Sequence, residues 1–331
     1  MSCKNHLDHE SYCSVPRPQA LRDITPNALP IRFKISTRKS PVTRRTFIAQ
    51  VSGLTATFAA PQVFAQKKRL KFGVGPFLAT AEDTRKSFTP LFAHLAKELG
   101  NMEFDLAVST DWAGLAVAMG SGQLDAAWMG PWGYVIANNA TNCQAVATVK
   151  YDNKPTYQAI IIARPDLDVK KFPDDTRGKS ISFADVGSTS GWLVPTFVAK
   201  EIWKIDPKSY WKYSEGASHT ANEIAVASGQ VDMATDFDRN RNAMISTGKI
   251  KPDATKIVWT SDPLPNDAFA LPTTASPELT KQIQAILTSI TQEQALGIMP
   301  NRYTGFVPAT HATYKTIESA GLTLGRIKAK A

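Results

Sequence analysis

The sequence predicts an α/β protein whose sheets are mainly parallel and flanked by helices. Short apolar runs alternate with helical patterns from Arg69 onward, the succession that builds parallel strands joined by helices. A second such unit begins after the apolar runs AVATVKY and YQAIIIARP. Polar and aromatic loops follow the predicted strands, at the place where open α/β sheets bind their ligands. These observations predict two α/β units whose loops form the walls of a cleft.

The first unit starts with the strand RLKFGVGPF, which ends at Gly75 and Pro76. From Thr89 to Leu99 the apolar residues recur at helical spacing, and Pro90 fits the first turn of a helix there. The strand FDLAV, a helix over 112–119, the strand DAAWM and a helix over 134–138 follow. This order is a βαβ succession.

The second unit repeats the alternation with other residues. Its predicted elements are the strand ISFAD, a helix over 191–203, the strand WKYS, a helix over 220–228, the strand VDMAT, a helix around Arg241 and the run KIVWTS. The chain then passes Pro263 and Pro265 and returns through DAFALP to two final helices, over 277–291 and 311–319. We expect the returning segment to complete the first unit.

The first 65 residues differ from the rest in charge and pattern. They hold nine of the 38 Lys and Arg residues and three of the 29 Asp and Glu residues, so the remainder carries only +3 of the net charge of +9. The stretch over 43–66 starts with Arg44 and Arg45, continues through a short apolar run and ends in VFAQ. It resembles a twin-arginine signal cleaved after Ala65, which predicts export to the periplasm; an uncleaved membrane anchor is the alternative. Our hypothesis is that residues 1–41 precede the true start.

Few residues after the leader suit catalysis, metal binding or nucleic-acid binding. Cys143 is the only cysteine there, and it is either a small buried residue or a ligand for a thiophilic solute. The sequence contains no HExxH motif and no glycine-rich cofactor loop, and the basic run KKRLK is short. We therefore expect no enzyme activity, no cofactor, no metal, no nucleic acid and no second membrane-spanning segment.

The stretch DVGSTSGWLVP, 185–195, is the most informative loop. A nucleophile elbow needs serine midway between two glycines, but Thr189 holds that place between Gly187 and Gly191. The remaining interpretation is a helix N-terminus whose unpaired amides, with the hydroxyls of Ser188, Thr189 and Ser190, bind an oxyanion. A plain serine cap is the alternative.

Three segments together carry a family resemblance: DVGSTSGWLVP, SHTANEIAVASGQVDMATD and DPLPNDAF. They resemble the periplasmic phosphonate-binding proteins and their phosphite-binding relatives, and the similarity runs from about Leu70 to the final helices. The resemblance implies a two-lobed Venus-flytrap of the type II periplasmic binding protein class, a monomer that delivers its ligand to the permease of an ABC importer. It places one lobe at 66–157 plus 261–331 and the other at 158–260.

The resemblance also implies which residues meet the ligand. Ser188, Thr189, Ser190 and His219 would bind the oxyanion, and Asp267 matches a carboxylate that faces the cleft. For His219 a helix cap, and for Asp267 an Asx turn after Pro265, are the alternatives. The remaining predicted contacts are Trp112, Met129, Tyr134, Asp236 and Phe237, of which the aromatic residues and Met129 would form an apolar wall or pack the lobes.

Two departures from the family decide the predicted ligand. Trp112 and Met129 stand where aminoalkylphosphonate-binding members carry tyrosines, and Arg239 stands where they carry a glutamate for the ligand amine. We therefore expect phosphite or a small alkylphosphonate in preference to phosphate and 2-aminoethylphosphonate. The alternative is a sensor of arsenite, arsenate or phosphate that partners a membrane histidine kinase, with Cys143 as its only support.

Overall fold

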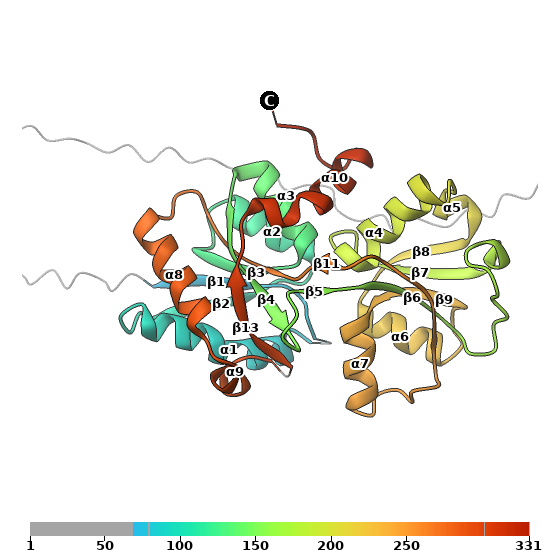
Figure 1. Cartoon of the computed structure of the whole chain (residues 1–331), viewed down its shortest axis with the longest axis horizontal. Helices are drawn as coiled ribbons and strands as arrows, with labels where there is room; N and C mark the ends of the chain where they lie inside the picture. Colours follow the sequence, from blue (N-terminus) through green and yellow to red (C-terminus); the bar gives the residue numbers. More distant parts are fainter. Residues whose placement is uncertain (1–68, 79, 301, 331) are drawn as a thin grey trace, which may run out of the picture. The chain divides into compact units, whose positions relative to one another are not determined.

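Two β-sheets organise the chain in the computed structural model, which describes residues 69–78, 80–300 and 302–330. The six-stranded sheet has the order β13-β4-β12-β3-β1-β2 (Figure 1). Its strands are β1 (Leu70–Val74), β2 (Phe104–Val108), β3 (Ala126–Met129), β4 (Gln144–Tyr151), β12 (Ala268–Leu271) and β13 (Tyr303–Pro308). We call this sheet with its helices the first lobe.

The five-stranded sheet has the order β10-β6-β9-β7-β8 and forms the second lobe with its helices. Its strands are β6 (Ala159–Ala163), β7 (Ser180–Ala184), β8 (Lys212–Ala217), β9 (Met233–Phe237) and β10 (Lys256–Thr260). The chain crosses between the sheets twice, and there β5 (Thr156–Tyr157) pairs with β11 (Leu264–Pro265) in antiparallel fashion. We propose lobe boundaries at these crossings, near residues 157 and 261.

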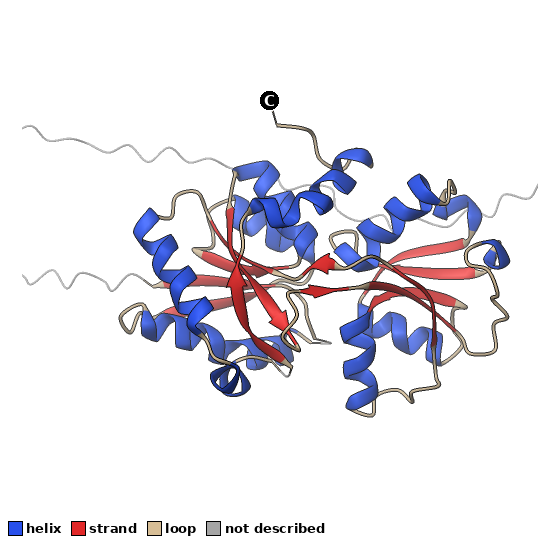
Figure 2. Ribbon diagram, in the orientation of Figure 1, coloured by secondary structure: helices blue, strands red, loops and turns tan. Residues whose placement is uncertain are grey.

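Helices cover both faces of each sheet (Figure 2). The helices of the first lobe are α1 (Ala81–Glu98), α2 (Trp112–Gly120), α3 (Pro131–Thr141), α8 (Pro277–Ser289), α9 (Gln292–Ile298) and α10 (Lys315–Thr323). Those of the second lobe are α4 (Val194–Phe197), α5 (Pro207–Tyr210), α6 (His219–Ala227) and α7 (Asp238–Ser246). π-helical turns at Thr189–Leu193 and Val198–Ile202 extend α4 into one helical segment from 189 to 202. Short 3₁₀ turns stand at Asp174–Thr176 and His311–Tyr314.

Alternating side chains of the strands pack both layers of helices. In β3, Ala126 and Trp128 join the cluster under α1 and α8, whereas Ala127 and Met129 face the cluster of α2 and α3. In β6, Ile160 and Ile162 pack against α6, and their neighbours in the strand face the opposite layer. Strands buried on both faces read as continuous apolar runs, which explains why YQAIIIARP lacks a polar alternation.

The predicted alternation of strands and helices is confirmed, but the sheets are mixed rather than mainly parallel. In the first lobe only β1–β2 and β1–β3 are parallel, because β12 returns from the other lobe and inserts antiparallel between β3 and β4. In the second lobe β7–β8 and β7–β9 are parallel, and β6 pairs antiparallel with β9 and β10. The edge strand β13 was not predicted.

The helix predicted to start at Thr89 starts eight residues earlier, at Ala81. Thr80 caps it by accepting a hydrogen bond from the Asp83 N–H (3.0 Å), and Pro90 lies inside the helix. The first two turns are largely polar and solvent-facing, so their sequence carries little apolar periodicity.

The predicted signal over 43–66 and the cleavage after Ala65 lie outside the described residues. Within the part of the chain that the structure describes, no helix is both long and apolar enough to span a membrane.

The core under α1 gives a direct test of this packing. Leu95 is fully buried there, whereas Leu296 on α9 is 74% exposed. We expect Leu95→Ala to lower the free energy of unfolding by about 2–5 kcal/mol, because it leaves a cavity, and Leu296→Ala to change it by less than about 0.5 kcal/mol. Urea denaturation followed by tryptophan fluorescence measures both, and equal losses would contradict the assignment of the core.

Candidate functional site

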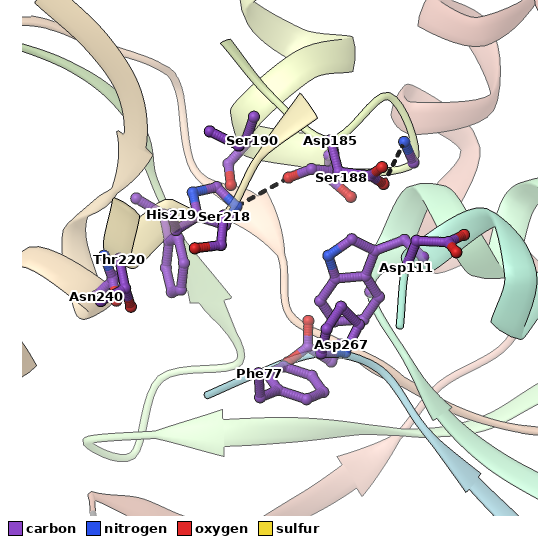
Figure 3. A pocket seen from close by; sticks show the side chains of 18 of the residues that line it. Phe77, Asp111, Asp185, Ser188, Ser190, Ser218, His219, Thr220, Asn240 and Asp267 are labelled. Atoms are coloured by element: carbon purple, nitrogen blue, oxygen red, sulfur yellow. Dashed lines mark hydrogen bonds between the residues drawn. The ribbon is translucent and has the colours of Figure 1, made fainter. Parts of the chain in front are cut away.

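A cavity of about 290 Å³ lies where the loops of the two lobes meet. Most of its lining comes from the loops that follow β1, β2 and β3 in the first lobe and β7, β8 and β9 in the second, and Tyr157 and Asp267 near the two crossings complete it. These are the carboxyl ends of the parallel strands in each sheet, as the sequence predicts. Figure 3 shows Ser188, Ser190 and His219 on one side of this cavity and Asp267 on the other.

Five helix N-termini open onto the cavity, those of α2, α3, the segment from 189 to 202, α6 and α7. Each N-terminus carries unpaired backbone N–H groups and a partial positive charge. The N-terminus of α2 is partly neutralised by Asp111, whose Oδ1 accepts a hydrogen bond from the Gly114 N–H (2.6 Å). The N-terminus of α7 is likewise opposed by Asp238, whose Oδ1 accepts a hydrogen bond from the Arg239 N–H (2.8 Å). The remaining three favour an anionic ligand.

The GSTSG loop forms the start of the helical segment at 189. Ser188 caps it, because its Oγ accepts a hydrogen bond from the Gly191 N–H (3.1 Å). Thr189 Oγ1 accepts the N–H of Trp132 at the start of α3 (2.8 Å), which ties the loop to the other lobe. All three hydroxyl residues are buried, with exposed fractions of 3–4%, and all three line the cavity.

The two glycines of the loop allow close approach on both sides. A Cβ at Gly187 would lie 2.7 Å from Trp112 Cβ and 2.9 Å from the backbone N of Ala113, both in the first lobe. A Cβ at Gly191 would lie 2.3 Å from Ala184 Cβ and 2.7 Å from His219 Cε1. Glycine is therefore required for packing against α2 on one side and for contact with His219 on the other.

His219 is the first residue of α6, and its imidazole joins the loop to the core of the second lobe. Nε2 lies 2.9 Å from Ser188 Oγ, and Nδ1 lies 3.0 Å from Asp236 Oδ1. The ring also packs edge-on against Phe237, with centroids 4.7 Å apart. Burial lowers the pKa of His219 to about 4, against the opposing charge of Asp185, so the imidazole is neutral at physiological pH.

Arg239 and Asp267 form the charged pair of the cavity. Arg239 Nη2 lies 3.9 Å from Asp267 Oδ2, which also accepts a hydrogen bond from Trp128 Nε1 (3.1 Å). Burial raises the pKa of the Asp267 carboxyl, while Arg239 and the Trp128 N–H oppose that shift. The guanidinium is surrounded by four aromatic rings with centroids 4.7–5.7 Å from it, those of Tyr151, Tyr157, Phe237 and Tyr303.

The structure places the predicted site residues in two groups. Ser188, Thr189, Ser190, His219, Trp112, Phe237 and Asp267 line the cavity. Met129, Tyr134 and Asp236 do not line it and have exposed fractions of 0%. Direct ligand contact from these three is therefore not proposed.

Local geometry explains each of these three placements. Met129 faces the core of α2 and α3, and Tyr134 packs against Tyr314 with ring centroids 4.8 Å apart. Asp236 points to the opposite face of β9 from Phe237 and lies beneath His219, because successive side chains of a strand alternate.

Several lining residues were not predicted. Phe77 packs edge-on against Trp112 at 4.9 Å, and Tyr157 contacts Arg239. Asp185 lines the cavity and accepts the Gly187 N–H at Oδ1 (2.9 Å). The run GPF after the first strand, which places Phe77 in a strand-end loop, was the signal for that residue. Among the described residues, no group of three or more His, Cys, Asp or Glu side chains is placed to hold a metal ion.

This chain matches a family model and a named relative. The model, described as ABC transporter, phosphonate, periplasmic substrate-binding protein, covers residues 72–314. The chain is 30% identical over 271 residues to the phosphate-import protein PhnD of Mycolicibacterium smegmatis, covering 76% of this chain and 84% of that protein.

Two solved structures share the fold. The binding protein component of an ABC phosphonate transporter from Pseudomonas aeruginosa superposes with a TM-score of 0.69 at 21% identity, covering 78% of this chain and 87% of that one. PhnD1 of Prochlorococcus marinus in complex with methylphosphonate gives 0.69 at 19% identity, covering 79% and 100%. The predicted two-lobed α/β fold is thereby confirmed.

The buried imidazole predicts how stability changes with pH. An unfolded histidine binds a proton near pH 6.5, but folded His219 does so only near pH 4. Between these values the unfolded state takes up a proton that the folded state excludes. As the pH is lowered from 6.5 to 4, the contribution of His219 to the free energy of unfolding therefore decreases, by up to about 3 kcal/mol.

We expect His219→Asn to lose less stability than the wild type as the pH is lowered from 7 to 4.5. Urea unfolding at each pH measures the two slopes. Parallel slopes would show that His219 is not held neutral by burial.

Proposed function

Because the chain belongs to the family of periplasmic substrate-binding proteins of phosphonate ABC transporters, we propose that it captures phosphite or a small alkylphosphonate and delivers it to a membrane permease. The observation that carries this proposal is the buried hydroxyl triplet 188–190 at a helix N-terminus that opens onto the cavity. A phosphorus oxyanion has several acceptor oxygens, and hydroxyls and amides in a cavity that excludes water provide the donors they need. The protein would act as a monomer, exported through a twin-arginine signal cleaved after Ala65.

The apolar part of the cavity lining favours a substituent without hydrogen-bonding groups. Phe77, Trp112 and Phe237 present carbon surface to the ligand space. A hydrogen or methyl group on phosphorus fits such a wall, whereas the fourth oxygen of phosphate would be buried without a partner, at a cost of about 1–3 kcal/mol. The apolar lining therefore supports tighter binding of phosphite and methylphosphonate than of phosphate. The M. smegmatis relative, in contrast, is named as a phosphate-import protein.

The charges of the cavity do not favour an ammonium substituent. The guanidinium of Arg239 lies in the cavity wall and pairs with Asp267. Asp111 and Asp185 each already cap a backbone N–H. An ammonium group would meet a fixed cation and no carboxylate without a partner, which supports exclusion of 2-aminoethylphosphonate.

Asp267 supports recognition of a protonated ligand. A carboxylate repels an anion unless a proton lies between them. A monoanionic phosphonate carries one P–OH group, which can donate to Asp267 while the other oxygens face the hydroxyl triplet. Burial raises the pKa of the Asp267 carboxyl, and the Arg239 guanidinium 3.9 Å away opposes that shift by favouring the ionised, accepting form.

Two other functions have less support. The distances from Ser188 to His219 to Asp236 match those of a hydrolase triad, but Ser188 Oγ is engaged as a helix cap and His219 is a weak base. Cys143, on which arsenic sensing depends, is fully buried outside the cavity lining, and burial raises its thiol pKa to about 12.

The double variant Ser188→Ala with Thr189→Ala tests the oxyanion site. We expect it to weaken phosphite binding at least 100-fold in calorimetric titration, because two buried donors are lost. Ser246→Ala with Thr247→Ala, a consecutive and exposed Ser-Thr pair of the same lobe, is the matched control. Unchanged phosphite affinity in the first variant would contradict the proposed site.

The pair methylphosphonate and methanesulfonate tests the role of Asp267. Both carry one negative charge at mildly acidic pH and have the same size, but only the phosphonate has a proton to donate. We expect the wild type to bind methylphosphonate at least tenfold more tightly, and Asp267→Asn to lose that preference. The exposed Asp262→Asn is the control. If the wild-type protein bound both ligands with equal affinity, Asp267 would not accept a hydrogen bond from a P–OH group.

A further inference from the structure

Three titratable side chains form a row behind the hydroxyl triplet. His219 faces Ser188, Asp236 lies behind His219, and Glu223 of α6 neighbours Asp236. Asp236 and Glu223 both have exposed fractions of 0%. Asp236 accepts hydrogen bonds from Asn240 Nδ2 at both carboxyl oxygens (3.0 and 2.9 Å). A buried carboxyl pair of this kind needs a proton or a cation to be stable.

Among the described residues, no Lys or Arg side chain forms a salt bridge with Asp236 or Glu223. Glu223 Oε2 accepts a hydrogen bond from Thr255 Oγ1 (3.2 Å), and Arg241 Nε donates to that same hydroxyl (3.1 Å) rather than to the carboxyl. Glu223 Oε1 has no hydrogen-bond partner within the described residues. The other charged neighbours, Asp185 and Asp238, are negative. The surroundings therefore favour a proton on the pair.

The hydroxyl of Ser188 has one proton and must give it to one acceptor. Its oxygen already accepts the Gly191 N–H. If His219 Nε2 carries no proton, Ser188 donates to it and turns a lone pair toward the cavity. If Nε2 carries a proton, that N–H donates to Ser188 Oγ and the serine proton is free to point at a ligand oxygen. The tautomer of His219 thus decides whether Ser188 is a donor to an anion.

The far nitrogen of His219 couples this tautomer to Asp236. An ionised Asp236 requires a proton on Nδ1, whereas a protonated Asp236 can donate to Nδ1 and leave the ring proton on Nε2. Nδ1 lies 3.0 Å from Asp236 Oδ1, so one proton between these two atoms can belong to either of them. The protonation state of Asp236 therefore sets which ring nitrogen carries the imidazole proton.

We propose that the buried Asp236–Glu223 pair binds a proton that fixes the tautomer of His219 and thereby turns the Ser188 hydroxyl toward the oxyanion. Loss of this proton reverses the hydrogen bonds. Asp236 then accepts from Nδ1, and Nε2 accepts from Ser188, so the oxyanion site loses one hydrogen-bond donor. Asp236 and Glu223 act on the ligand only through His219, so both are positioning residues. The proposal rests on the proposed function for the identity of the ligand.

The direction of each pKa shift agrees with this arrangement. Burial raises the pKa of Asp236 to about 7, and burial together with the charge of Asp236 raises that of Glu223 to about 8. Burial lowers that of His219 to about 4, so the proton stays on the carboxyl pair and the ring is neutral. The donor arrangement is present below about pH 7 and is lost as the pH rises through the range of these two carboxyls.

Nitrogen-15 NMR of the ligand-free protein tests the tautomer directly, with the His219 resonances assigned by His219→Asn. We expect the ring proton on Nε2 at pH 6 and a shift to Nδ1 by pH 9. In Asp236→Asn, whose amide donates to Nδ1 at every pH, the proton should stay on Nε2 throughout. A wild-type ring that keeps one tautomer from pH 6 to 9 would overturn the proposal, and this result needs no bound ligand.

Phosphite titration of the same proteins tests the consequence for binding. The ratio of the wild-type Kd to the Asp236→Asn Kd removes the ligand's own ionisation, and we expect it to rise at least tenfold from pH 6 to 9. The exposed Asp168→Asn should keep a ratio that is independent of pH. A constant ratio for Asp236→Asn would overturn the proposal. If phosphite does not bind the wild type at pH 6, the proposed ligand is wrong, and the NMR experiment still decides the proton switch.

Discussion

The site depends on one constraint. The N-terminus of the helical segment at 189 must open onto a cavity, and the side chains around it must neither block it nor neutralise its positive charge. Ser188 caps the helix with a hydroxyl rather than a carboxylate, so the positive end of the segment is not neutralised. Gly187 and Gly191 permit the approach of α2 and His219 that encloses this end. The bond from the Trp132 N–H to Thr189 Oγ1 joins it to the first lobe. An acidic cap at position 188 would neutralise the positive end of the segment, and a bulkier residue at position 187 or 191 would clash with Trp112 or with Ala184 and His219.

The charged residues around the cavity are arranged in two separate pairs. Asp236 pairs with His219 behind the cavity wall, and Asp267 pairs with Arg239 in the cavity lining. Asp236 and Arg239 do not pair with each other, because the pleat of β9 and the start of α7 place them apart. Because the aromatic rings that surround Arg239 include Tyr151 and Tyr303 of the first lobe, this side chain of the second lobe also holds the lobes together.

The sequence predicted the α/β class, most strand positions and the hydroxyl loop, because apolar runs, helical spacing and the GSTSG pattern are local signals. It did not predict β13 or the antiparallel insertion of β12, since strand order depends on where the chain returns after two crossings. Met129 and Tyr134 were expected at the cavity from their positions in strand-end loops, yet their side chains face the core. Glu223 was missed because a glutamate in an amphipathic helix gives no sign of burial; only the packing of α6 on β9 places it beside Asp236.

A crystal structure of the protein with methylphosphonate tests the central claim most directly. The account predicts phosphoryl oxygens within about 3 Å of the hydroxyls of Ser188, Thr189 and Ser190 and of the backbone amides at the start of the helical segment, with the methyl group against Trp112 and Phe237 and one oxygen facing Asp267. A phosphoryl group bound instead by Arg239, with the hydroxyl triplet contacting only protein, would contradict it.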